Sequence, residues 1–336
     1  MNQNYREFES ILKDWNSTTI GRKSFLASLP ILFAACAMSD KSRYREGDNA
    51  GQNTSLTVQD EVKLTESVKP QMQKDYPMIQ NADLQNYIST LGNDLVRANN
   101  LQGNPYNYNF TVVGVNYVNA FALPAGTVYI TAPLIAMADT EAELLGVVGH
   151  EVGHIQARHT AERMDAAKKA ESSTWKYAVG GGAVGGIAGF GLGKLLCPPN
   201  DNGCLAKATA AGAAVGAGGG YLIQKYTFMA NSRENEMEAD RIGFKRSIAA
   251  NYSKAHVGKF YEKLLQMEKE NKKGGNAVLA SLTDAMSTHP PSQERVNQMN
   301  KMVEEAPGNS GAKVSSNAFD QMKKFCIEWS RQNQKS

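Results

Sequence analysis

The sequence lacks a strong charge bias, internal repeats and a nucleic-acid-binding motif. Its 36 basic and 33 acidic side chains give a formal net charge of +3, and no dense block of lysine and arginine occurs. Nucleic acid is therefore not an expected partner. With 42% hydrophobic and 21% charged residues, the 336-residue chain has the composition of a globular protein with one main folded core.

Long hydrophobic runs are also scarce. The apolar stretch FLASLPILFAACAM, at 25–38, follows Arg22 and Lys23, ends in small residues and is too short to span a bilayer. This arrangement is typical of a signal peptide, so we predict an export signal over 1–36 and a linker over 37–55. FAAC resembles the box that precedes a lipidated cysteine, which makes Cys36 the lipidation candidate. Ordinary cleavage at Ala35 and Ala37 is the alternative.

Cysteine is rare, with four residues in the chain. Cys197 and Cys204 flank the turn-rich stretch PPNDNG, and export to an oxidising compartment predicts a disulfide between them, with Cys326 left free. If the protein were cytosolic, all three would be reduced and buried. The two cysteines lie inside a Gly/Ala-rich apolar hairpin, 178–222, which favours either membrane contact or a tight helix pair.

Hydrophobic periodicity predicts a mainly helical α+β fold. We expect two helices within 57–99, strands at 108–115 and 127–131, and helices at 232–243 and 259–270. A further helix is expected to begin after Thr140, with Glu143 completing a capping box. A loop is predicted around 288–296, and a tail, 306–336, carries one short helix. The small sheet should lie beside the helix that follows Thr140.

That helix contains the pattern His-Glu-x-x-His. His150 and His154 lie one turn apart, so both imidazoles leave the same face and can bind one metal ion. Glu151 is offset from this pair and lies where a base can take a proton from a zinc-bound water. The pattern therefore predicts a zinc-dependent hydrolase, with Glu151 as the catalytic base.

A catalytic zinc ion needs a third protein ligand. The candidates are the four carboxylates of one predicted helix: Glu234, Glu236, Glu238 and Asp240. Glu236 and Asp240 share a face, so Glu236 could bind the metal while Asp240 holds a ligand histidine by a hydrogen bond. A run of carboxylates is more often a solvated helix face, and the residues alone leave this choice open.

Three segments resemble one protein family. NAFALPAGTVYIT, EAELLGVVGHEVGHIQARH and SRENEMEAD, in this order, are similar to the M48 metallopeptidases over roughly 56–303, and we assign 56–305 to an M48-like peptidase domain. The resemblance implies a zincin-like fold, one Zn²⁺ per chain and Glu236 as the third ligand. A THPP motif at 288–291, as in the bacterial periplasmic branch, implies that His289 caps the metal site at rest.

The resemblance implies an endopeptidase of the bacterial cell envelope, in the periplasm and anchored by lipid to the outer membrane. Its expected substrates are unfolded or misassembled envelope polypeptides, bound along TVYIT as an edge strand. The alternative is a non-proteolytic assembly factor with a capped or vestigial zinc site. The residues Arg158, His159 and His256 are expected to be structural. The family's Pro-Gly-Gly is Pro124, Ala125 and Gly126 here, which alters the expected turn.

Overall fold

The computed structural model describes residues 54, 56–103, 105–163, 231–271 and 288–333. The predicted export signal, almost all of the linker and the hairpin over 178–222 lie outside the described residues. The same holds for Cys36, Cys197 and Cys204. Within the described ranges the chain is mainly helical with one small sheet, as the sequence predicts.

The sheet has three strands in the order β1-β3-β2, where β1 is Asn109–Val113, β2 is Ala120–Ala122 and β3 is Thr127–Thr131. β1 pairs with β3 in parallel and β2 pairs with it antiparallel. β3 is the TVYIT segment, so the prediction that it forms an edge was wrong. The three-residue strand β2 is too short for its alternation to be recognised, and it covers the side of β3 that was expected to be free.

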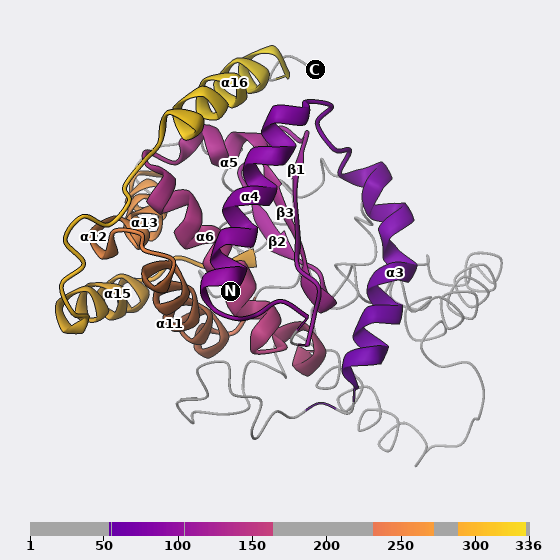
Figure 1. Cartoon of the computed structure of the whole chain (residues 1–336), viewed down its shortest axis with the longest axis horizontal. Coiled ribbons are helices and arrows are strands. Elements are labelled where there is room, and N and C mark those ends of the chain that lie inside the picture. Colours follow the sequence, from indigo (N-terminus) through magenta and orange to yellow (C-terminus); the bar gives the residue numbers. More distant parts are fainter. Residues whose placement is uncertain (1–53, 55, 104, 164–230, 272–287, 334–336) are drawn as a thin grey trace, which may run out of the picture.

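Helices cover both faces of this sheet because its side chains alternate between two apolar clusters. Val112 and Ile130 belong to the larger cluster, which α4 (Ala82–Ala98) and α6 (Glu141–Gln156) complete. Val113 and Tyr129 belong to the smaller cluster, to which α3 (Val58–Asp75) contributes. Figure 1 accordingly places α3 on the opposite side of the sheet from α4 and α6.

The start of α6 is fixed by Thr140, whose side chain accepts a hydrogen bond from the Glu143 amide over 3.2 Å. The predicted capping box is incomplete, because the Glu143 carboxylate accepts from the amide of Asp139 over 3.0 Å. The Glu143 carboxylate thus accepts from Asp139, the residue before Thr140, whereas a capping box would use the amide of Thr140 itself. Lys263 donates to the same carboxylate and draws it toward α13 (Lys259–Asn271).

The helix α11 (Arg233–Ala249) crosses α6 at backbone contact. A Cβ atom at Gly153 would lie 2.8 Å from the carbonyl oxygen of Ala239, and one at Gly243 would lie 2.6 Å from the amide nitrogen of His150. Larger residues would hold the helices apart. This close crossing brings the carboxylates of α11 to the histidines of α6.

The remaining elements surround this pair. They are η2 (Pro124–Gly126), α5 (Ala132–Met137), α12 (Lys254–Val257), α15 (Gln293–Glu305) and α16 (Asn317–Asn333). The expected loop at 288–296 is shorter than predicted, since α15 begins at Gln293 with Ser292 as its cap. The expected short helix of the tail is α16, which buries Phe319 and Cys326 against the larger cluster.

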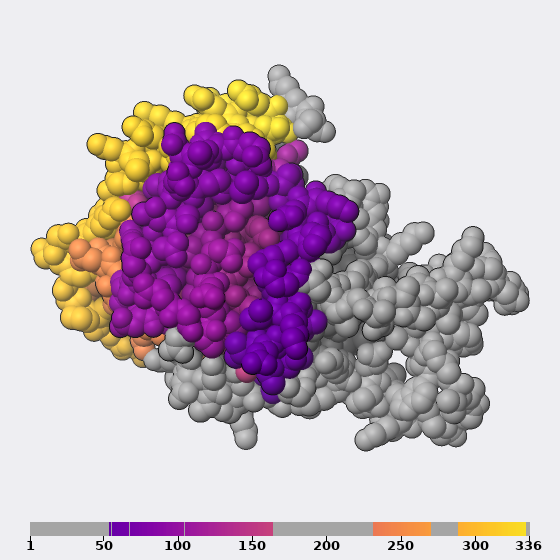
Figure 2. Space-filling model, turned by 45° about the vertical axis from the view of Figure 1, so that its right-hand side comes forward, coloured from indigo at the N-terminus to yellow at the C-terminus, as the bar shows by residue number. Residues whose placement is uncertain are grey.

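The space-filling view shows α3 at the surface along one side of the described body, with α16 along another (Figure 2). Among the described helices, none combines the length and the apolar character needed to cross a bilayer.

Candidate metal centre

Four side chains from three segments converge at the crossing of α6 and α11. The Nε2 atoms of His150 and His154 are 2.9 Å apart, as expected for imidazoles one helical turn apart. The two carboxylate oxygens of Glu236 lie 3.2 Å from Nε2 of His154 and 3.4 Å from Nε2 of His150. All three side chains are buried.

His289 is the fourth member of this cluster and comes from the segment before α15. Its Nδ1 lies 3.2 Å from Nε2 of His150 and 3.1 Å from a Glu236 oxygen. Its Nε2 lies 3.4 Å from the carboxylate of Glu151. His289 therefore stands between the other three side chains and the expected base.

The donor set fits a transition-metal ion such as zinc. One donor atom from each of the four residues lies within 4.8 Å of the other three. Around a tetrahedral zinc ion with bonds of about 2.0–2.1 Å, neighbouring donor atoms are separated by about 3.3 Å. The separations of 2.9–3.4 Å described above bracket this value. Imidazole nitrogens and a carboxylate oxygen are also the ligands that zinc accepts.

A second layer of charged groups holds His150 and Glu236. Nδ1 of His150 lies 2.8 Å from Asp240, whose carboxylate accepts two hydrogen bonds of 2.7 Å from the guanidinium group of Arg295. A third nitrogen of Arg295 lies 2.7 Å from Glu236. The guanidinium group also stacks over the ring of Tyr261, 4.7 Å from its centroid. All of these side chains are buried.

This arrangement shifts the pKa values of Glu236 and Glu151 in opposite directions. Burial alone would raise the pKa of Glu236, but Arg295, His289 and His150 outweigh it and hold that pKa well below its ordinary value. Glu151 differs, because burial dominates over the nearby histidines and raises its pKa. Glu236 is therefore set as an anion, whereas Glu151 is tuned toward accepting a proton.

The two α6 histidines are also distinguished by their surroundings. Burial opposes the charged form of His150, yet Glu236 and Asp240 outweigh it and raise its pKa to about 9. Burial and the neighbouring His150 lower the pKa of His154 well below its ordinary value, which favours the neutral imidazole.

His159 reaches the site by an unexpected route. In a continuous helix, an imidazole five residues after His154 would point away from the metal face. However, α6 ends at Gln156, and Arg158 adopts the left-handed conformation with a φ of 55°. His159 is turned back, so that its Nδ1 lies 2.8 Å from Nδ1 of His154 and its Nε2 lies 3.2 Å from Glu238. His159 is outside the four-residue cluster but contacts one of its members.

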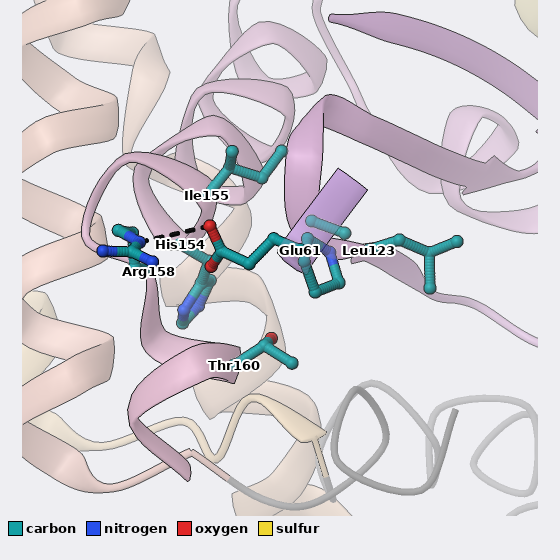
Figure 3. A pocket seen from close by; sticks show the side chains of 8 residues that line it. Glu61, Leu123, His154, Ile155, Arg158 and Thr160 are labelled. Atoms are coloured by element: carbon teal, nitrogen blue, oxygen red, sulfur yellow. Dashed lines mark hydrogen bonds and ion pairs between the residues drawn. The ribbon is translucent and has the colours of Figure 1, made fainter. Parts of the chain in front are cut away.

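Arg158 and Glu61 line a pocket beside His154 (Figure 3). Nε of Arg158 donates to the Glu61 carboxylate over 3.2 Å, and the hydroxyl of Tyr106 donates to the same oxygen. The remaining walls come from the β2–η2 connection, from the end of α6 and from the segment that follows it; they are formed by Ala122, Leu123, Pro124, Ile155 and Thr160. The helix α3, which carries Glu61, thus contributes to the surroundings of the metal centre.

Comparison with known proteins identifies the family. The model of peptidase family M48 matches residues 82–303, and this range includes His150, His154, Glu236 and His289. The chain belongs to peptidase family M48. The match begins at the first residue of α4, so the M48 range leaves out α3 and its Glu61.

Among M48 relatives, the beta-barrel assembly-enhancing protease of Escherichia coli K12 is 25% identical over 287 residues, which cover 83% of this chain and 53% of that protein. The mitochondrial metalloendopeptidase OMA1 of Arabidopsis thaliana is 32% identical over 55% of this chain and 29% of its own length. The metalloprotease LoiP of E. coli K12 is 33% identical over 34% of this chain and 44% of its own length. The chain spans about half the length of the first of these relatives.

Sequence reasoning missed two groups that surround the M48 site, Arg295 and Glu238. Arg295 lies just after the THPP motif that contains His289, but the sequence did not indicate which carboxylates Arg295 would contact. Glu238 was set aside as a neighbour of Glu236, although both are buried and neither lies on a solvated face. His256 is only partly buried on α12 and bonds to Ser253, away from the cluster, as expected for a structural histidine.

Proposed function

We propose that this protein is a zinc-dependent endopeptidase. The observation that carries the proposal is the convergence of His150, His154, Glu236 and His289 beside Glu151, at separations that suit one zinc ion. When bound, zinc supplies Lewis-acid activation of a water molecule and of a peptide carbonyl.

The side chains of the chain then have distinct roles. Glu151 takes a proton from the attacking water and returns it to the leaving amine, for which its raised pKa suits it. Glu236, His150 and His154 hold the ion. Asp240, positioned by Arg295, fixes the ring of His150.

His289 is proposed as a resting-state cap. A catalytic zinc site keeps one coordination position open, and four protein ligands would fill it. His289 also approaches Glu151, in the space that the water would need. We therefore propose that it withdraws before substrate enters. The same contact favours the second candidate function, an envelope assembly factor whose site stays capped and cuts nothing.

An extended substrate is proposed to run along β2. This strand pairs with β3 on one side, and its last residue, Ala122, which at 9% is the most exposed of its three buried residues, lines the pocket beside His154. Pairing through backbone hydrogen bonds tolerates many sequences, which suits unfolded or misassembled polypeptides. The name of the E. coli relative, a beta-barrel assembly-enhancing protease, supports substrates of the bacterial envelope. We propose a periplasmic location with a lipid anchor at Cys36, and membrane contact through residues 178–222.

The first experiment measures zinc content and casein cleavage for the mature protein and a Glu151→Gln variant, with a chelator-treated sample as control. We expect about one zinc ion per chain in both proteins and cleavage in the wild type alone. If zinc is bound and nothing is cut, a His289→Ala variant separates a capped protease, which gains activity, from an assembly factor, which does not. A wild type that binds no zinc contradicts the proposal.

The anchor needs a separate test. Labelling of the protein with a fatty-acid probe in cells should depend on Cys36, and a Cys36→Ala variant should leave the membrane fraction. Unchanged fractionation of that variant argues against the lipid anchor.

A further inference from the structure

The contacts behind His154 form a chain of three side chains. Nδ1 of His154 faces Nδ1 of His159, and Nε2 of His159 faces the carboxylate of Glu238. We infer that Glu238 and His159 are positioning residues that fix the tautomer of His154, so that its Nε2 presents a lone pair to the metal. The inference rests on the metal-binding role proposed above.

The direction of the hydrogen bonds follows from the acceptor at the far end. A carboxylate accepts hydrogen bonds from its neighbours, so this assignment places a proton on Nε2 of His159, 3.2 Å from Glu238. A neutral imidazole has one protonated and one bare nitrogen. Nδ1 of His159 is therefore the bare nitrogen and can only accept a hydrogen bond.

The same rule then applies to His154. Its Nδ1 is 2.8 Å from an acceptor, so this nitrogen carries the proton and donates. Its Nε2 is left bare, and that atom faces Nε2 of His150 and the carboxylate of Glu236. The opposite tautomer would point an N–H group at the cluster and could not bind a metal ion.

Burial makes this constraint effective. The side chains of His159 and Glu238 are both 0% exposed, so bulk water cannot replace either partner. The turn at Arg158, which the Glu61 carboxylate holds over 3.2 Å, keeps His159 beneath the end of α6. The spacing of His159 predicted an imidazole that points away from the metal face of a continuous helix. The helix ends before this residue, so the spacing no longer sets the direction of its ring.

The two α6 histidines are consequently supported in different ways. Nδ1 of His150 meets the carboxylate of Asp240 directly, at 2.8 Å. Nδ1 of His154 reaches the carboxylate of Glu238 through a second imidazole. A carboxylate at the end of each path orients both rings for the same ion.

The test uses leucine and glutamine as a pair of similar volume. Leucine removes the acceptor, whereas the glutamine carbonyl keeps one. Zinc affinity of the full-length protein is measured by competition with a chelator, for Glu238→Leu against Glu238→Gln and for His159→Leu against His159→Gln. We expect each leucine variant to bind zinc about 10–100-fold more weakly than wild type, and each glutamine variant to recover part of the loss.

Two controls separate the explanations. A His256→Leu variant removes an imidazole that contacts Ser253 outside the cluster, and its zinc affinity should equal that of the wild type. If the wild type binds no zinc, the proposed function fails. If the wild type binds zinc and the leucine and glutamine variants bind it equally, the positioning role is wrong.

A measurement on the unaltered protein covers the case in which a variant does not fold. Nitrogen-15 spectra of the histidine side chains in the metal-free wild type distinguish bare from protonated ring nitrogens. We expect the proton on Nδ1 of His154 and on Nε2 of His159. A proton on Nε2 of His154, or on both nitrogens of His159, would overturn the inference.

Discussion

The replacement of Arg295 by methionine should strongly destabilise the metal-free protein. Arg295 is 2% exposed, and its guanidinium group makes two contacts of 2.7 Å with Asp240 and one of 2.7 Å with Glu236. Methionine fills a similar length without charge. The substitution would leave two buried carboxylates without their main compensating cation.

The size of the effect follows from this burial. Removing one partner of a buried ion pair costs about 3–5 kcal/mol, because the remaining charge stays desolvated. The matched control is Arg233→Met, since Arg233 also links α11 to α15, by a 2.9 Å contact with Glu294. Both of those side chains are more than half exposed, and an exposed pair contributes about 0–1 kcal/mol.

The free energy of unfolding is measured by urea denaturation at pH 7 with a chelator present. We expect Arg295→Met to lower it by about 3–5 kcal/mol and Arg233→Met by no more than about 1 kcal/mol. Arg295→Lys should fall between them, because it keeps the charge but loses the two parallel hydrogen bonds to Asp240. Equal losses for the two methionine variants would refute the reasoning.

Four further outcomes are expected. Ala125 has a left-handed φ of 66°, so Ala125→Gly should raise the free energy of unfolding in urea by up to about 1 kcal/mol, after the greater freedom of glycine in the unfolded chain is subtracted. Gly243→Ala would place a Cβ atom 2.6 Å from the backbone of His150 and should cost about 1–3 kcal/mol in the same assay, with weaker zinc binding. Burial raises the pKa of Cys326 to about 12, so mass spectrometry should find this thiol unalkylated in native protein at about pH 8, below the ordinary thiol pKa, and alkylated after unfolding. Burial raises the pKa of Tyr252 to about 12, so the neutral hydroxyl stabilises the folded state. This contribution is complete below about pH 10 and is lost as the pH rises toward 12. Tyr252→Phe should therefore flatten the fall in the free energy of unfolding that urea denaturation measures over this pH range.

The elements that carry the metal centre could be predicted because their signals are local. Two histidines one turn apart identify a metal-binding face, and a threonine before an apolar helix identifies its start. Both signals depend only on neighbours along the chain. The position of α6 follows from them, whereas that of β3 follows from its run of β-branched and aromatic residues; the structure confirms both elements.

The features that sequence analysis did not predict depended on local backbone conformation or on tertiary packing. The edge position of β3 was excluded by β2, which pairs Phe121 with Tyr129 across a tight connection. The orientation of His159 depended on where α6 ends, and thus on the left-handed Arg158. No periodicity encodes either feature. The partners of Arg295 are similarly set by the packing of α15 against α11.

The burial of α11 explains why the carboxylate run could not be interpreted from composition. The helix has charged residues on several sides, yet Glu236, Glu238 and Asp240 are all buried at 1% exposure or less. Such burial is tolerated only when each carboxylate has a compensating group. Glu236 and Asp240 have Arg295 and His150, and Glu238 has His159. The backbone contact at Gly153 and Gly243 is what makes these pairings possible, since a wider crossing would leave the same carboxylates in solvent.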